Sequence, residues 1–189
     1  MSARHAKKPS VAGETAAGKS FLKAVYEYAE TILVAMLLLV LLFTFIFRVA
    51  SVVGDSMLPT LQTQERLILT THFYEPSCGD IVVIDRYTQE PLIKRVIGVA
   101  GDTIRIDGVN GIVYRNGEAL VEKYVSGPTS PKEMQGEVVI PEGYIFVLGD
   151  NRGVSKDSRS TEIGFVDTED VVGKAVWRIW PLNRFGVVK

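Results

Sequence analysis

The chain has 189 residues with 21 basic and 22 acidic side chains, and its formal net charge of −1 lacks the excess positive charge of nucleic-acid-binding proteins. A single cysteine and two histidines exclude an intramolecular disulfide framework and a zinc cluster of cysteine and histidine ligands. We therefore expect no nucleic-acid partner, no metal and no other cofactor.

The N-terminal part predicts a tail and a membrane anchor. Residues 1–20, rich in Ala, Ser, Gly and Lys, are typical of a disordered cytoplasmic tail. From Thr31 to Phe47, 17 residues carry no charge. At about 1.5 Å per residue they make a helix of roughly 25 Å, close to a hydrocarbon core of about 30 Å. We predict a transmembrane helix over residues 21–50.

Basic residues flank this anchor unequally. The residues before it are Arg4, Lys7, Lys8, Lys19 and Lys23. Arg48 alone stands in the first fifteen residues after the uncharged run. The positive-inside rule then predicts a single-pass protein of the cell membrane, with the N-terminus cytoplasmic and residues 51–189 extracytoplasmic. A cleaved signal peptide is the alternative, but its apolar region is usually only about 7–15 residues long.

Beyond Ser51 the pattern changes to short β-branched runs separated by turn signals, which predicts a mainly β domain. The predicted strands are residues 66–71, 81–85, 92–99, 103–107, 112–115, 137–140, 144–148 and 171–179. Asn116-Gly117 between two such runs predicts a hairpin. A short helix could begin near residues 57–61. Residues 126–136, with two prolines and two glycines, predict an exposed loop.

Ser56 is the candidate nucleophile. It stands in Gly54-Asp55-Ser56-Met57-Leu58-Pro59-Thr60-Leu61, where a serine is most often a helix cap or a turn residue. Gly54, however, permits a substrate backbone to approach. The free N–H groups of a helix start could also bind a developing oxyanion.

A serine hydroxyl needs a base, and the histidines offer little choice. His5 falls on the cytoplasmic side, so only His72 could complete a Ser-His-Asp triad. Its place near the end of a predicted strand is more typical of an ordinary structural residue. The remaining common base is a lysine. Burial can lower the pKa of its amine from about 10.4 to roughly 7–8.

Lys94 is the best candidate for this lysine. Strand alternation places it on one face with Leu92 and Val96, in apolar surroundings. On composition alone, Lys94 and Arg95 could instead be charges that protect an edge strand from aggregation.

A third polar cluster, residues 149–159, follows the apolar strand over residues 144–148. Ser155 could orient the lysine amine, while Asp150, Asp157 and Arg159 could brace the loop. On its own such a cluster is more often a solvated turn.

In this order behind one anchor, the three clusters closely resemble type I signal peptidases, membrane serine proteases with a serine-lysine dyad. Residues 54–61 look like the family's nucleophile box, residues 94–98 like its general-base box and residues 149–159 like its last box. The resemblance spans roughly residues 30–185. It implies the β fold shared by signal peptidases and repressor-type proteases, behind a single N-terminal transmembrane helix. A reduced accessory β region would occupy about residues 103–145.

The resemblance also implies a role for each matching residue. Ser56 would be the nucleophile and Lys94 the general base, with Ser155 hydrogen-bonded to the lysine. The supporting ion pairs would be Asp157 with Arg159 and Asp150 with Arg95. The oxyanion and substrate-binding groups would be Ser56, through its backbone N–H, Gly54 and Met57.

Two positions depart from the family's pattern. Gly54 stands where some members carry a serine, which points to the Gram-positive-like subgroup. Gly153-Val154 replaces an Asp-Asn pair, so the contacts that those side chains would make are absent.

The implied activity is removal of N-terminal signal peptides from exported preproteins after small residues, in the Ala-x-Ala pattern, through an acyl-enzyme. Its partners would be signal peptides, membrane lipid and the protein-export machinery. Trp177 and Trp180 could seat the domain on lipid headgroups or pack in its core. The sequence assigns no role to Cys78.

Two other functions stay open at this point. One is a self-cleaving serine-lysine protease of the repressor-processing kind, against which the anchor argues. The other is a catalytically silent, anchored β-module that binds peptides.

Overall fold

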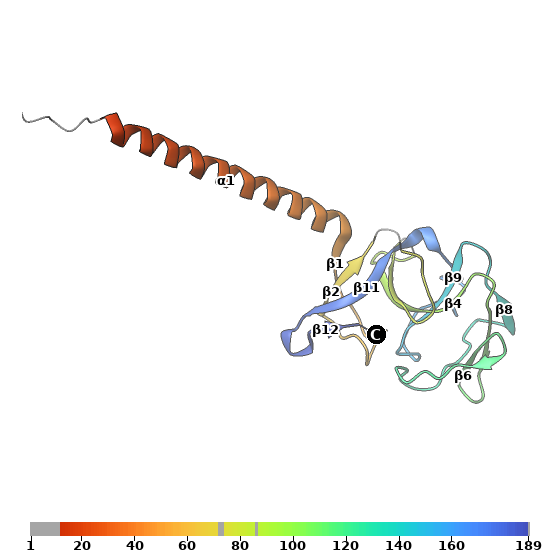
Figure 1. Cartoon of the computed structure of the whole chain (residues 1–189). Helices are drawn as coiled ribbons and strands as arrows, with labels where there is room; N and C mark the ends of the chain where they lie inside the picture. Colours follow the sequence, from red (N-terminus) through yellow and green to blue (C-terminus); the bar gives the residue numbers. More distant parts are fainter. Residues whose placement is uncertain (1–11, 72–73, 86, 189) are drawn as a thin grey trace, which may run out of the picture. The chain divides into compact units, whose positions relative to one another are not determined.

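The computed structural model describes residues 12–71, 74–85 and 87–188 (Figure 1). His72, the histidine considered for a triad, lies outside the described residues. The chain divides into two units, Met1–Thr44 and Phe45–Lys189, and each is described by itself.

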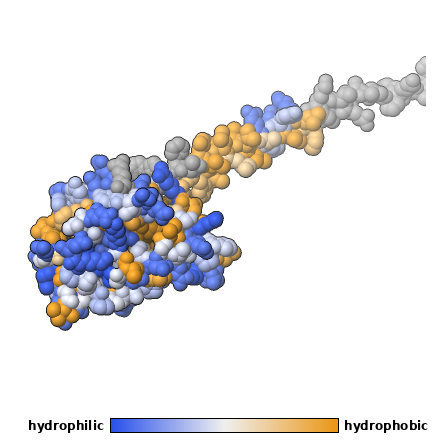
Figure 2. All heavy atoms as spheres, turned by 180° about the vertical axis from the view of Figure 1, so that it is seen from behind, coloured by the Kyte–Doolittle hydropathy of each residue, from blue (hydrophilic) through white to orange (hydrophobic). Residues whose placement is uncertain are grey.

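The first unit is dominated by the helix α1 (Ala12–Ile46). Its segment Ser20–Leu41 has a mean hydropathy of 1.8 and exposed side chains, so it is long and apolar enough to cross a membrane. Figure 2 shows apolar atoms, in orange, along much of this helix. Residues 12–20 belong to α1. The helix ends at Ile46 and not near residue 50, because the next five residues pair as a strand.

The second unit contains two antiparallel sheets, with strand orders β1-β2-β11-β3-β4-β9-β10 and β7-β6-β5-β8, and β12 pairs with β11. The larger sheet comprises β1 (Phe47–Ser51), β2 (Arg66–Thr70), β3 (Ile81–Ile84), β4 (Leu92–Val99), β9 (Tyr144–Leu148), β10 (Val166–Asp167), β11 (Val171–Trp180) and β12 (Gly186–Val187). The smaller sheet comprises β5 (Thr103–Asp107), β6 (Ile112–Arg115), β7 (Glu118–Ala119) and β8 (Glu137–Val139). Two short 3-10 helices, η1 (Thr168–Asp170) and η2 (Leu182–Arg184), flank β11. The predicted mainly β domain behind one apolar helix is confirmed.

All eight predicted strands are present, with ends shifted by at most one residue. The hairpin is also confirmed, because Asn116 and Gly117 have φ angles of 52° and 80° between the paired strands β6 and β7. The strands that the sequence did not predict are β1, β10 and β12. β1 continues an apolar run whose pattern also fits a helix, and β10 and β12 have only two residues each.

The core of the β unit consists of three apolar clusters, and β4 contributes to all of them. Ile93 packs in the first cluster, Val96 in the second and Ile97 in the third. The first cluster also holds Met57 and Leu61 from the turn that follows β1. The segment around Ser56 is therefore fixed by the hydrophobic core.

Residues 126–136, expected to be an exposed loop, lie in the connection between β7 and β8, and eight of these eleven residues are exposed. We call residues 120–136 the strap. Thr129 in its middle is only 1% exposed, and Pro131 and Met134 are half-buried. The strap is therefore partly packed against the rest of the domain.

Candidate active site

Ser56 lies in a tight turn. Leu58 N–H donates to the Asp55 carbonyl at 3.2 Å, and Leu61 N–H donates to the Met57 carbonyl at 2.9 Å, but residues 57–61 form no helix. Gly54 has φ +82°, a conformation that favours glycine. Met57, expected to contact substrate, is 1% exposed, so its side chain anchors the turn in the core.

Lys94 meets Ser56 at this turn. It lies on β4, which is hydrogen-bonded to β3 on one side and to β9 on the other, and it is only 2% exposed. The edge-strand interpretation is therefore wrong. Lys94 Nζ donates to Ser56 Oγ at 2.8 Å and to the carbonyl of Ile93 at 2.9 Å.

Burial decides the charge of this amine. Desolvation lowers the pKa of Lys94 from 10.5 to about 8, although the carboxylates of Asp157 and Asp150 act in the opposite direction. A substantial fraction of the amine is therefore neutral in mildly alkaline solution. The pair can act as a nucleophile with its general base.

Asp150 links three parts of the site. Both its oxygens accept from Arg95, at 2.8 and 2.7 Å, and both residues are buried. Arg95 also donates to the Gly79 carbonyl at 2.9 Å and lies 3.9 Å above the ring of Tyr124. Thr60 in the serine's turn donates to Asp150 at 2.5 Å. The ion pair expected from the sequence therefore also holds the turn that carries Ser56.

Thr60 is held from a second side by a buried cluster near the C-terminus. Arg178 and Arg184 both donate to its carbonyl, at 3.1 and 3.4 Å. The same arginines pair with Glu65, which is 1% exposed, at 3.1 and 2.6 Å. No motif or spacing in the sequence indicates this cluster.

Asp157 and Arg159 form the second expected ion pair. Both side chains are buried, with two hydrogen bonds of 2.8 Å between them. Burial alone would raise the pKa of Asp157, but the hydrogen bonds and charge of Arg159 outweigh it and leave that pKa below its usual value. Asp157 also accepts from Gly149 N–H at 3.1 Å, which fixes the start of the loop.

The loop over residues 149–159 closes tightly on Ser56. Asn151 N–H donates to the Ser56 carbonyl at 3.0 Å, and its side-chain amide donates to the Asp55 carbonyl at 3.1 Å. Ser155 is fully buried, but its hydroxyl, expected to hydrogen-bond Lys94, makes no well-formed hydrogen bond with the described residues. A Cβ on Gly149 would lie 2.2 Å from Ser155 Oγ and 2.5 Å from the Ser56 carbonyl oxygen. Only glycine fits there.

The strap supports this loop from outside. Arg152 forms a buried pair with Glu122 of the strap, at 2.5 Å, and donates to Thr129 Oγ1, also at 2.5 Å. Arg159 donates to the Ser130 carbonyl at 3.0 Å. Lys132 donates to the carbonyl of Ser155. Thirty residues separate Glu122 from Arg152, so no spacing in the sequence signals their contact.

A groove of about 450 Å³ lies beside β1, which is an edge strand of the larger sheet. Its apolar lining includes Ala50, Val53 and Ile93, the last being the neighbour of Lys94. Arg48 and Glu90 add charge to its lining. An edge strand beside a groove can accept an extended peptide by strand addition.

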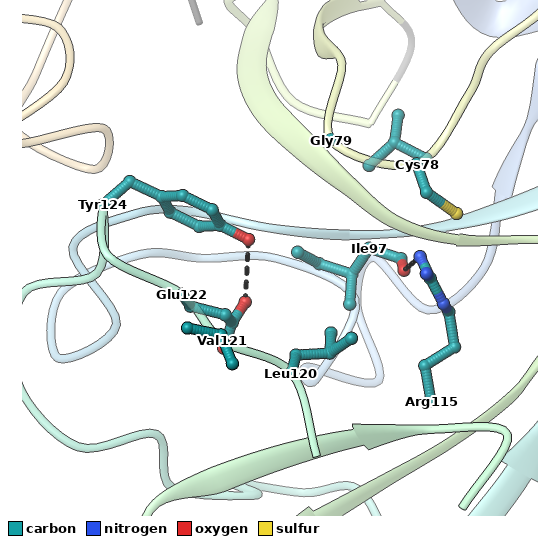
Figure 3. A pocket seen from close by; sticks show the side chains of 9 residues that line it. Cys78, Gly79, Ile97, Arg115, Leu120, Val121, Glu122 and Tyr124 are labelled. Carbon is teal, nitrogen blue, oxygen red and sulfur yellow. Dashed lines mark hydrogen bonds between the residues drawn. The ribbon is translucent and has the colours of Figure 1, made fainter. Parts of the chain in front are cut away.

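A second cavity, of about 220 Å³, contains neither Ser56 nor Lys94 in its lining (Figure 3). The strap contributes Tyr124, which donates to Glu122 at 2.9 Å, and Cys78 lies at the opposite side. Burial raises the pKa of the Cys78 thiol, so it is a poor nucleophile near neutral pH. Within residues 12–71, 74–85 and 87–188, no group of three histidine, cysteine or acidic side chains could hold a metal ion.

Comparison with known proteins gives consistent matches. The family described as "Signal peptidase, peptidase S26" matches residues 25–180. A probable signal peptidase I-1 from Synechocystis sp. (strain ATCC 27184 / PCC 6803 / Kazusa) is 36% identical over 174 residues, which cover 86% of each chain. Signal peptidase IB from Staphylococcus aureus (strain COL) is 34% identical over 184 residues, which cover 86% of this chain and 93% of that one. A solved signal peptidase I from Enterococcus faecalis V583 is 29% identical, with a TM-score of 0.44, over 53% of this chain and 97% of that chain.

We expect Gly149→Ala to disrupt the site. The added methyl group must displace Ser155 or the Ser56 carbonyl, and overpacking of this kind costs about 1–3 kcal/mol. Thermal unfolding should show the loss of stability, and acylation of Ser56 by a serine-reactive probe should show the loss of reactivity. Gly153→Ala is the matched control, because its Cβ would meet no atom within 4 Å. Equal behaviour of the two variants would contradict the tight contact.

Proposed function

The chain belongs to the signal peptidase family, peptidase S26, and we propose that Ser56 and Lys94 form its catalytic dyad. Membership of this family makes the protein a peptidase with signal peptides as substrates, which argues against the catalytically silent module. One observation carries the dyad proposal. A lysine that is 2% exposed donates from its Nζ to a serine hydroxyl 2.8 Å away.

The first half of the proposed reaction forms an acyl-enzyme. Neutral Lys94 takes the proton of Ser56 Oγ as this oxygen attacks the carbonyl carbon of the scissile bond. The tetrahedral intermediate then collapses, the C–N bond breaks, and protonated Lys94 gives its proton to the departing amine. The mature protein leaves with its new N-terminus, and the signal peptide stays esterified to Ser56.

The second half releases the signal peptide. Lys94, neutral again, takes a proton from a water molecule that attacks the ester carbon. The ester bond breaks, and the proton returns from Lys94 to Ser56 Oγ. The products are the free enzyme and the signal peptide's carboxylic acid, which loses its proton to solvent, so no metal or other cofactor takes part in the proposed steps.

We assign the oxyanion hole to the backbone of the Ser56 turn. The Ser56 N–H donates to no acceptor among the residues that the structure describes, so it is free for a developing oxyanion. Gly54 adds no side-chain donor but leaves the approach to this turn open, since a Cβ there would meet no atom within 4 Å. Met57 supports the turn from the core.

The two carboxylate-arginine pairs have a supporting role in this proposal. Asp150 with Arg95 and Asp157 with Arg159 hold the loop and the serine's turn at fixed positions. Buried charged groups need such partners, because an unpaired one is strongly destabilising. The Ser155 hydroxyl makes no well-formed hydrogen bond with the described residues, although it acts on the Asp157 carboxylate and lowers its pKa. In this proposal it orients the Lys94 amine during turnover.

For the substrate we propose an extended segment that adds to the free edge of β1. The residues before the cut would enter the groove lined by Ala50, Val53 and Ile93. A shallow apolar lining of this kind suits small side chains, as in an Ala-x-Ala pattern. The substrates would be exported preproteins delivered by the export machinery.

We propose that α1 anchors the protein with its N-terminus in the cytoplasm, as the flanking charges predict, and that the β domain also touches lipid. Trp177 and Trp180 are 45% and 51% exposed, so they do not belong to the core. Leu182 and Phe185 nearby in the chain are also exposed. Exposed aromatic residues of this kind are typical of the membrane interface.

We expect activity to rise with pH through about 8, because Lys94 has its pKa at about 8 and acts only when neutral. Below that pKa the neutral fraction, and with it kcat/KM, falls about tenfold per pH unit. Cleavage of a model preprotein by the full chain in detergent, followed between pH 6 and 9, measures this pH dependence.

Ser56→Ala and Lys94→Ala should remove activity without unfolding the domain. Normal turnover by Lys94→Ala would rule out the dyad.

Cleavage should depend on the residue before the cut. With alanine at positions −1 and −3 of a model preprotein, mass spectrometry should locate a single cut after position −1. Leucine or phenylalanine at −1 should lower kcat/KM by roughly tenfold or more, because the larger side chain does not fit a shallow pocket. The same substitution at +2 serves as the control. Equal cleavage of both substrates would refute the proposed selectivity.

Contact with lipid can be tested by fluorescence, because Trp177 and Trp180 are the only tryptophans in the chain. In the full chain reconstituted into vesicles, lipids brominated near the headgroup should quench the fluorescence of both tryptophans. The variants Trp177→Phe and Trp180→Phe separate the two contributions. Quenching by aqueous iodide alone, with no effect of the brominated lipids, would show that these residues face water.

A further inference from the structure

Lys132 of the strap is a residue that the proposed reaction does not yet use. Its side chain is largely exposed, but its ammonium group donates to the carbonyl of the fully buried Ser155. Its backbone has φ +52°, which is uncommon for a residue other than glycine and concentrates at functional sites. The strap therefore brings one lysine into direct contact with the loop beside the dyad.

The charges around this loop are otherwise paired. Arg95, Arg152 and Arg159 each bind a carboxylate within 3 Å. Lys132 forms no ion pair among the residues that the structure describes, and its one hydrogen bond goes to a neutral carbonyl. The exposed carboxylate of the next residue, Glu133, interacts with this charge. Lys132 therefore places a positive charge beside the residues that surround Lys94.

Nearby charges act on the Lys94 amine in opposite directions. The buried carboxylates of Asp157 and Asp150 favour its charged form. Each of these carboxylates is paired with a buried arginine. Lys132 acts in the opposite sense and lowers the pKa of Lys94. A positive charge that adds to the effect of burial helps a general base, which must be neutral to work.

We propose that Lys132 is a positioning residue of the dyad: it fixes the Ser155 carbonyl from the strap and places a positive charge that favours the neutral form of Lys94. This inference rests on the proposed role of Lys94 as the base. It adds a role for a residue outside the three sequence clusters, supplied by the accessory region.

The test is the pH dependence of kcat/KM for the full chain acting on a model preprotein. In Lys132→Met the rise of activity should move to higher pH by roughly half a unit, so that the rate near pH 7 falls about threefold while the rate above pH 9 is kept. Lys132→Arg retains the charge and should restore the wild-type profile. Lys123→Met, which removes another exposed lysine of the strap, should leave the profile unchanged.

Ionic strength gives a second measurement on the same proteins. Salt screens an exposed charge such as Lys132 much more than the buried carboxylates. Raising the salt concentration should move the wild-type profile to higher pH and leave that of Lys132→Met in place.

The outcomes separate this inference from the dyad itself. A wild-type profile with no rise near pH 8, or an active Lys94→Ala variant, would refute the base assignment. If the base is upheld but Lys132→Met lowers the rate equally at every pH, or changes nothing, the role of Lys132 is refuted.

Discussion

The hydrogen bond between Lys94 and Ser56 depends on keeping an amine out of water. In water a lysine is protonated near neutral pH, whereas in the interior of the β domain its pKa falls to about 8. This requires β4 to be an interior strand, covered on both faces and paired on both sides. The extensive core around a single strand is therefore a condition for the chemistry, because an equally placed lysine on an edge strand would stay charged.

Burial of one amine then constrains its neighbours. Two carboxylates lie close enough to favour its protonation, and each is bound by a buried arginine. The carboxylate of each ion pair also accepts a further hydrogen bond, Asp150 from Thr60 and Asp157 from the Gly149 N–H. The same groups therefore balance charge and hold Ser56 and the loop within contact of each other.

Much of this was predictable from the sequence, because strands and turns have short-range signals. Alternation and turn residues located eight strands, and the search for a base led to Lys94 since the histidines were poorly placed. What could not be predicted depends on contacts between distant residues. The pairing of β1 with β2 ends the helix early, and Glu122 reaches Arg152 across the strap. The short helix expected near residues 57–61 is a turn, in which the Leu61 N–H donates to the Met57 carbonyl.

The bonds from Arg178 and Arg184 to the Thr60 carbonyl have a consequence for how this enzyme is made. Thr60 emerges early during synthesis of the β domain, and these two arginines emerge more than a hundred residues later. A nascent chain translated only as far as the Gly149 loop already has its serine and its lysine but lacks these two contacts. The turn that carries Ser56 can therefore complete its contacts only after residues 178–184 have been synthesised and have folded against it.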